Sequence, residues 1–186
     1  MKTLFIHGLA SSGAYKMASS LRILLKPCEV ISPDVPIEPG EAFALLRRIC
    51  DIENPDLVIG LSLGGFWAQK LRGCRKILVN PDFHVSRLLR TMTGEREYLS
   101  PRADGARTFT ITDEICDAYE EIEKVEFDGL TDDEVRLTRG MFATEDEVVR
   151  QRDEFESHYP GQSISYPGRH LPVFPELKRY LVPLIQ

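Results

Sequence analysis

The chain has 186 residues, of which 42% are apolar, and a formal net charge of −6. That length and apolar content suit a single globular domain over residues 1–186 with a sizeable core. The acidic balance argues against general binding to nucleic acid or to an anionic membrane, since both need clustered positive charge.

The cysteines and the start of the chain indicate the compartment. Cys28, Cys50, Cys74 and Cys116 are widely spaced, with no Cys-x-x-Cys and no nearby histidine pair. We therefore expect reduced thiols and no metal site. The first apolar run ends at His7, too early for an export signal, and no span of about 20 apolar residues follows. These features predict a cytoplasmic protein without a membrane partner.

Strands and helices are expected to alternate along the first 80 residues. Short apolar runs predict strands, and stretches with helical period predict helices. In chain order these are a strand at 3–6, a helix at about 14–25, a strand at 29–32, a helix between 40 and 54, a strand at 57–61, a helix from 62 and a strand at 76–79. Such alternation predicts a parallel sheet whose ligands bind beyond the carboxyl ends of the strands.

A serine lies where the strand at 57–61 turns into a helix, in the sequence Gly60-Leu61-Ser62-Leu63-Gly64. This is the pattern of a nucleophile elbow, in which a tight turn exposes the serine hydroxyl. Glycines two positions before and after the serine remove side chains that would collide with neighbouring chain. The helix start offers its positive dipole, and the Leu63 N–H faces the place where an oxyanion would form.

The loop after the first strand has two interpretations. The spacing of Gly8 and Gly13 nearly matches a phosphate-binding loop, but alanine and tyrosine follow Gly13 where that motif needs lysine and a hydroxyl residue. The alternative is an oxyanion loop, in which the N–H of Leu9 or Ala10 is the second donor. His7 then has a structural role.

Residues 83–128 differ in pattern from the flanking sequence and are interpreted as an inserted cap. We expect no convincing strand there, and an amphipathic helix at 113–125 with a solvated acidic side. Arginines that face the cleft would hold an anionic portion of a substrate; the candidates are Arg87, Arg90, Arg96, Arg102 and Arg107.

The sheet is expected to resume at 135–143, followed by a helix to about residue 158, a last strand at 163–166 and a closing helix from about residue 174. Glu145, Asp146 and Glu147 follow the first of these strands, and His170 follows the second. The chain order of serine, acid and histidine is that of the α/β-hydrolase triad. A neutral imidazole takes the serine proton, and a carboxylate fixes the histidine tautomer.

With these residues, the sequence resembles the α/β-hydrolase superfamily and, more narrowly, the YqiA-like family of predicted bacterial esterases. The resemblance rests on Phe5-Ile6-His7-Gly8, on residues 60–68, on Val79-Asn80-Pro81, on Asp146-Glu147-Val148 and on Gly168-Arg169-His170. It implies a compact hydrolase fold that lacks the first strands of larger members. It also implies Ser62 as nucleophile, Asp146 as acid and His170 as base.

The expected activity is hydrolysis of a small-molecule carboxylic ester or thioester through an acyl-enzyme on Ser62. Leu63 and Leu9 are the expected oxyanion donors, and no metal or organic cofactor is expected. Two alternatives remain open. One is thioesterase or acyltransferase action on phosphate-bearing acyl carriers, and the other is a catalytically inactive protein that binds ligands in the same cleft. The sequence does not indicate the acyl length or the oligomeric state.

Overall fold

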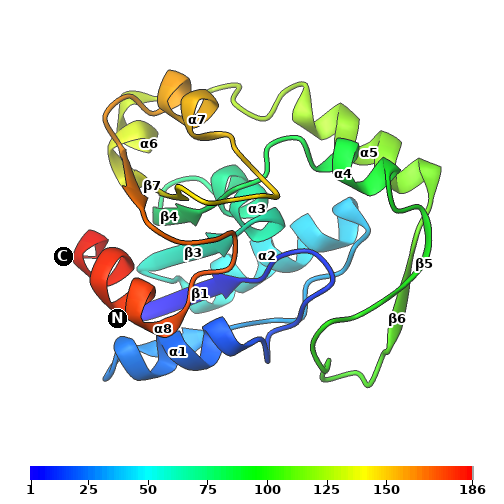
Figure 1. Cartoon of the computed structure of the whole chain (residues 1–186), viewed down its shortest axis with the longest axis horizontal. Coiled ribbons are helices and arrows are strands. Elements are labelled where there is room, and N and C mark those ends of the chain that lie inside the picture. Colours follow the sequence, from blue (N-terminus) through cyan, green and yellow to red (C-terminus); the bar gives the residue numbers. More distant parts are fainter. Residues whose placement is uncertain (186) are drawn as a thin grey trace.

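A six-stranded sheet is the centre of the computed structural model, which describes residues 1–185 (Figure 1). Every pairing within this sheet is parallel, and the strand order is β2-β1-β3-β4-β7-β8. The strands are β1 (Lys2–Ile6), β2 (Glu29–Ile31), β3 (Leu57–Leu61), β4 (Arg75–Val79), β7 (Thr138–Ala143) and β8 (Ser163–Tyr166). The predicted parallel α/β architecture is confirmed.

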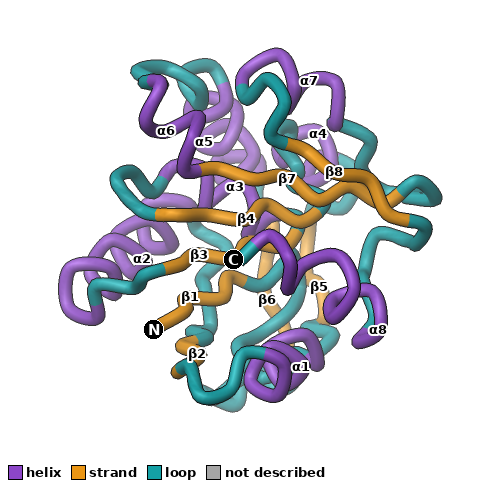
Figure 2. The backbone as a smooth tube through the Cα atoms, turned by 90° about the vertical axis from the view of Figure 1, so that its left-hand side faces the viewer, coloured by secondary structure: helices purple, strands orange, loops and turns teal. Residues whose placement is uncertain are grey.

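Helices cover both faces of this sheet (Figure 2). One face is covered by α1 (Lys16–Leu24) and by the C-terminal α8 (Phe174–Glu176), which continues as a π-helical turn over Leu177–Leu181 and a 3₁₀ turn over Val182–Leu184. The helices that pack into the core on the other face are α2 (Pro39–Glu53), α3 (Leu63–Lys70), α4 (Val85–Arg90), α5 (Asp113–Glu123) and α7 (Arg152–His158).

Alternating side chains of the strands divide the core into two layers. In β1, Leu4 and Ile6 pack on the side of α2 and α3, whereas Phe5 packs on the side of α1. All three are fully buried. Because both faces of a parallel sheet are covered, the central strands β1, β3 and β4 contain continuous apolar runs, whereas β8 at the edge alternates serine with Ile164 and Tyr166. This is why short apolar runs located the central strands in the sequence.

The expectation of no strand in residues 83–128 is wrong. This segment contains an antiparallel hairpin, β5 (Gly94–Glu97) and β6 (Thr108–Ile111). All four residues of β5 are exposed, so the strand carries no apolar signal. In β6 the exposed threonines alternate with buried Phe109 and Ile111, a period of two that the sequence does display. The helix expected at 113–125 is present as α5.

The strand expected at 135–143 also needs correction, because its first three residues belong to α6 (Asp132–Leu137). The Thr131 side chain accepts a hydrogen bond from the N–H of Glu134 at 3.3 Å, and acids fill the first turn. The sequence Thr-x-x-Glu is a helix-start signal that identifies this helix. Strand β7 therefore begins at Thr138.

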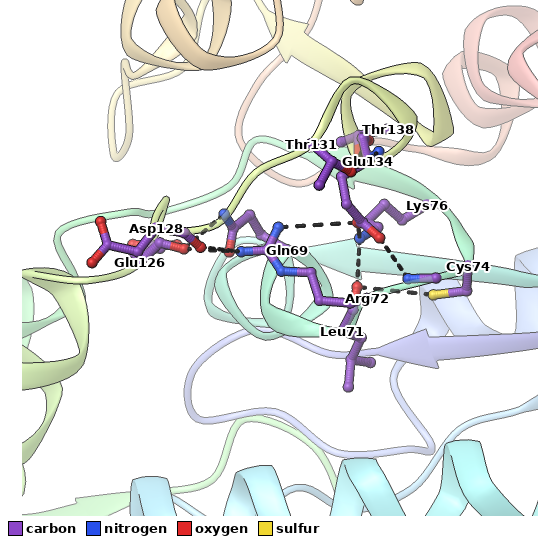
Figure 3. Close-up of polar contacts among 11 residues, drawn as sticks. Gln69, Leu71, Arg72, Cys74, Lys76, Glu126, Asp128, Thr131, Glu134 and Thr138 are labelled. Carbon is purple, nitrogen blue, oxygen red and sulfur yellow. Dashed lines mark hydrogen bonds and ion pairs between the residues drawn. The ribbon is translucent and has the colours of Figure 1, made fainter.

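A buried ionic cluster lies at the amino-terminal end of β4 (Figure 3). Lys76 is 1% exposed, and its ammonium contacts a carboxylate oxygen of Glu134 at 2.7 Å and also donates to the carbonyl of Leu71. The other Glu134 oxygen accepts from the N–H of Gly73 at 2.6 Å. These bonds attach α6 to the turn between α3 and β4. The cluster therefore lies at the edge of the sheet opposite to the carboxyl ends of the strands.

Among residues 1–185, none of the helices combines the length and the apolar character needed to cross a bilayer.

Candidate active site

Ser62 occupies the corner between β3 and α3 in a strained backbone conformation. Its φ is +54° and its ψ is −118°, in a region that L-residues rarely adopt. A Cβ added to Gly60 would lie 2.2 Å from the carbonyl oxygen of Gly64, and one added to Gly64 would lie 2.0 Å from the carbonyl oxygen of Ile6. The two glycines are therefore required by the close approach of three chain segments.

Backbone bonds hold this corner at the carboxyl edge of the sheet. The Ser62 N–H donates to the carbonyl of Val79 at 3.0 Å, and the Ser62 carbonyl accepts from Gly65 at 2.7 Å. The side chain is 7% exposed. Within the described residues, its hydroxyl makes no capping bond to α3, so it remains available for other chemistry.

Asp146 and His170 are brought together at the same edge by the loops after β7 and β8. Imidazole Nδ1 lies 2.7 Å from Asp146 Oδ2, and the Glu145 N–H donates to the carbonyl of Gly168 at 3.0 Å, which joins the two loops. With an ionised carboxylate at Nδ1, the proton is on Nδ1 and the lone pair is on Nε2. This is the tautomer that a general base needs.

The Asp146 carboxylate is itself held in place. It is 2% exposed, and Oδ1 accepts from the N–H groups of Val148 at 2.8 Å and Val149 at 2.9 Å. Burial alone would raise its pKa, but the hydrogen bonds from His170, Val149 and Val148 and the nearby imidazole charge lower the pKa below its ordinary value. Asp146 is therefore an anion at neutral pH, whereas the competing Glu145 and Glu147 are exposed.

Asn80, immediately after β4, was not identified by its chemistry in the sequence. Its Nδ2 donates to the carbonyl of His170 at 2.7 Å and to the hydroxyl of Tyr166 at 3.0 Å, and its Oδ1 accepts from the N–H of Ala143 at 2.8 Å. One buried amide thus connects β4, β7, β8 and the histidine loop. Its φ of +42° is a conformation that asparagine tolerates.

His7 fixes the loop that carries the predicted second oxyanion donor. Its Nε2 accepts from the N–H of Val35 at 2.9 Å, so the proton is on Nδ1, which donates to the carbonyl of Gly8 at 2.8 Å. The imidazole is 5% exposed, and this burial lowers its pKa from 6.5 to about 4. His7 is thus a neutral, structural histidine, as the sequence indicated.

The predicted donors lie on either side of the nucleophile. A Cβ added to Gly8 would lie 4.0 Å from Ser62 Oγ, so the loop that continues to Leu9 runs beside the hydroxyl. Leu63 follows Ser62 directly at the start of α3. Leu9 and Leu63 also line one common cavity. Their N–H groups belong to the two segments that flank Ser62 at this edge.

Within residues 1–185, Ser62 Oγ makes no hydrogen bond to His170. The His170 imidazole bonds instead to Asp146. Serine-to-histidine bonds are often long in unliganded hydrolases and tighten when substrate binds. His84 and His158 lie elsewhere, the first paired with Glu154 at 2.8 Å and the second stacked on Phe127.

Two of the candidate arginines have partners within the protein. Arg90 pairs with Asp117 and Glu120, each at 2.6 Å, on the surface between α4 and α5. The Arg102 guanidinium lies 4.5 Å from the ring centre of Tyr98 and donates to the carbonyl of Val35 at 3.3 Å. No group of three or more potential metal ligands occurs in residues 1–185.

The sheet order and the position of Ser62, Asp146 and His170 after β3, β7 and β8 define the α/β-hydrolase fold. Solved structures with the same fold include the methylesterase MES16 from Arabidopsis (TM-score 0.65, 11% identity, 100% of this chain and 98% of that chain) and a pyrethroid hydrolase from Sphingobium faniae JZ-2 (0.59, 18%, 100% and 95%). An esterase domain from Rhodothermus marinus aligns with a TM-score of 0.59 at 19% identity, over 95% of this chain and 80% of that chain.

The chain belongs to the uncharacterised protein family UPF0227, whose family model matches residues 2–185. The family match confirms the predicted YqiA-like family, and the solved structures confirm the α/β-hydrolase fold. A comparison with curated protein sequences finds no match.

Proposed function

We propose that this protein is a serine hydrolase that cleaves carboxylic esters or thioesters of small molecules through an acyl-enzyme on Ser62. The observation that carries the proposal is the 2.7 Å bond between His170 and a buried, ionised Asp146 at the sheet edge where Ser62 has a strained backbone conformation. Structural neighbours described as a methylesterase and a pyrethroid hydrolase support the reaction class.

In the first half of the reaction, Ser62 Oγ attacks the carbonyl carbon while His170 Nε2 takes its proton. The carbonyl oxygen becomes an oxyanion that accepts hydrogen bonds from the N–H groups of Leu63 and Leu9. As the tetrahedral intermediate collapses, the bond to the alkoxide or thiolate breaks and His170 gives the proton to that leaving group. The acyl group remains as an ester on Ser62.

In the second half, water attacks the acyl-enzyme and His170 takes a proton from it. Collapse of the second intermediate releases the carboxylic acid and returns the proton to Ser62. Asp146 remains ionised throughout and stabilises the imidazolium that forms twice in the cycle.

The test is ester hydrolysis by Ser62→Ala, with Ser165→Ala as a matched control because Ser165 is an exposed serine of β8. Ser62→Ala should lower kcat by about 10⁶-fold, as loss of the nucleophile does in serine proteases. Ser165→Ala should retain the rate of the unmodified protein. Undiminished turnover by Ser62→Ala, with its fold verified by circular dichroism, would reject the proposed function.

A further inference from the structure

A small apolar cavity lies beside the nucleophile on the side of the proposed oxyanion donors. Its volume is about 10 Å³, and it is lined by Leu9, Leu63, Ile37, Trp67, Tyr98 and Phe109, among others. A volume of that size accommodates about one water molecule or methyl group. We refer to it as the acyl cavity, because it is lined by Leu9 and Leu63, whose segments flank Ser62.

The wall formed by the β5–β6 segment is fastened to the body of the protein. The Leu99 N–H donates to the carbonyl of Ala10 at 2.7 Å, and the Ala103 N–H donates to Asp34 Oδ2 at 2.7 Å. The Tyr98 and Phe109 rings lie 4.7 Å apart between their centres. Enlarging the acyl cavity would break these contacts, so longer acyl chains are penalised.

Exposed apolar side chains also lie close in sequence to the acid and the histidine. Four of the nine large apolar side chains most exposed among the described residues lie within four positions of Asp146 or His170. They form what we call the alcohol-side patch: Val148 (58% exposed), Leu171 (46%), Val173 (50%) and Phe174 (39%). Single exposed apolar residues are ordinary, but their concentration around a histidine and its acid indicates a ligand surface.

The chemistry assigns the two sides to different parts of an ester. The alcohol of the ester lies beside the histidine that protonates it. The acyl substituent lies away from that histidine, where the acyl cavity is lined by Leu9 and Leu63. Given the proposed function, we infer that the preferred substrates are esters of a very short acid, with acetate fitting best, and an extended apolar alcohol that lies on the alcohol-side patch. The acyl cavity sets the length limit and the patch supplies apolar binding.

Two isomeric esters test this directly. Hexyl acetate and ethyl hexanoate have the same composition and differ in which side of the ester carries the six-carbon chain. Release of acid, followed by titration at constant pH, should give a kcat/KM for hexyl acetate that is about 10- to 100-fold higher. Each measurement is repeated with Ser62→Ala to define the rate that depends on the serine.

Variants then locate the preference. Phe109→Ala and, as a milder change in a partly buried residue, Ile37→Ala should raise kcat/KM for ethyl hexanoate relative to hexyl acetate because each enlarges the acyl cavity. Phe174→Ala should lower kcat/KM for hexyl acetate about threefold to tenfold through lost apolar contact. Val125→Ala is the control, since Val125 is 50% exposed but lies after α5, away from both surfaces.

Equal kcat/KM for the two isomers, or a preference for ethyl hexanoate, would overturn the inference. The proposed function would still stand in that case if the hydrolysis depends on Ser62. If neither isomer is hydrolysed above the Ser62→Ala background, the inference fails, and labelling of Ser62 by a fluorophosphonate decides separately whether the proposed function stands. Retained preference in Phe109→Ala and Ile37→Ala, each shown to be folded, would also contradict the assignment of the acyl cavity.

Discussion

Replacing Asp146 by asparagine changes one atom at the contact that sets the histidine tautomer. The variant amide keeps Oδ1, which accepts from Val148 and Val149 at 2.8 and 2.9 Å, so the loop should keep its shape. The new NH₂ group replaces Oδ2 at 2.7 Å from His170 Nδ1. Two donors cannot share that contact, so the imidazole adopts the tautomer that carries its proton on Nε2 and no longer accepts the Ser62 proton.

The expected loss follows from the same chemistry. Asp146→Asn should lower kcat by about 10⁴-fold, which is about 5 kcal/mol of transition-state stabilisation. Initial rates of ester hydrolysis measure it, and thermal unfolding verifies the fold. Glu145→Gln and Glu147→Gln are matched controls that should stay within a few-fold of the unmodified rate, because both carboxylates are exposed. An inactive Glu145→Gln beside a nearly normal Asp146→Asn would refute the reasoning.

Two further predictions concern the residues that support the site. Because burial lowers the His7 pKa from 6.5 to about 4, the unfolded chain binds a proton that the folded chain rejects, and the free energy of unfolding should fall by about 3 kcal/mol as the pH drops across that interval. Urea titrations at pH 6.5 and pH 4 measure this fall in the free energy of unfolding. The fall should be smaller by that amount in His7→Gln, whose side chain keeps a donor and an acceptor. An equal fall in His7→Gln and in the unmodified protein would contradict the burial argument. Asn80→Ala should release the histidine loop and lower kcat about 100-fold with little change in KM. A normal kcat in that variant would show that the His170 loop is positioned without Asn80.

Local patterns predicted the part of the site that depends on local backbone. The elbow is readable because Gly60 and Gly64 stand two positions before and after Ser62, even though the contact that requires Gly64 is with Ile6 of β1. The histidine and its acid follow strands whose order along the chain matches their roles, so the sequence also indicates where to look. Choosing Asp146 among three acids required its position in a turn, and its 2% exposure distinguishes it from both neighbours.

Features that depend on packing between distant segments were not predictable in the same way. The three hydrogen bonds of Asn80 reach β7, β8 and the histidine loop, and no spacing in the sequence encodes those partners. Strand β5 forms by pairing with β6 and has only exposed residues, so periodicity gives no sign of it. By contrast, the start of α6 can be recognised in the sequence from Thr131 and Glu134. This helix-start signal should have taken precedence over the strand predicted from residue 135.

Covalent labelling of Ser62 tests the central claim most directly. The intact protein is incubated with a fluorophosphonate, which phosphonylates a serine activated by a neutral imidazole, and its mass and modified peptide are determined. The structure-based mechanism predicts addition of one phosphonyl group, mapped to Ser62, with loss of ester hydrolysis in proportion to labelling. Labelling at another residue, or full esterase activity in protein whose Ser62 is completely modified, would contradict it.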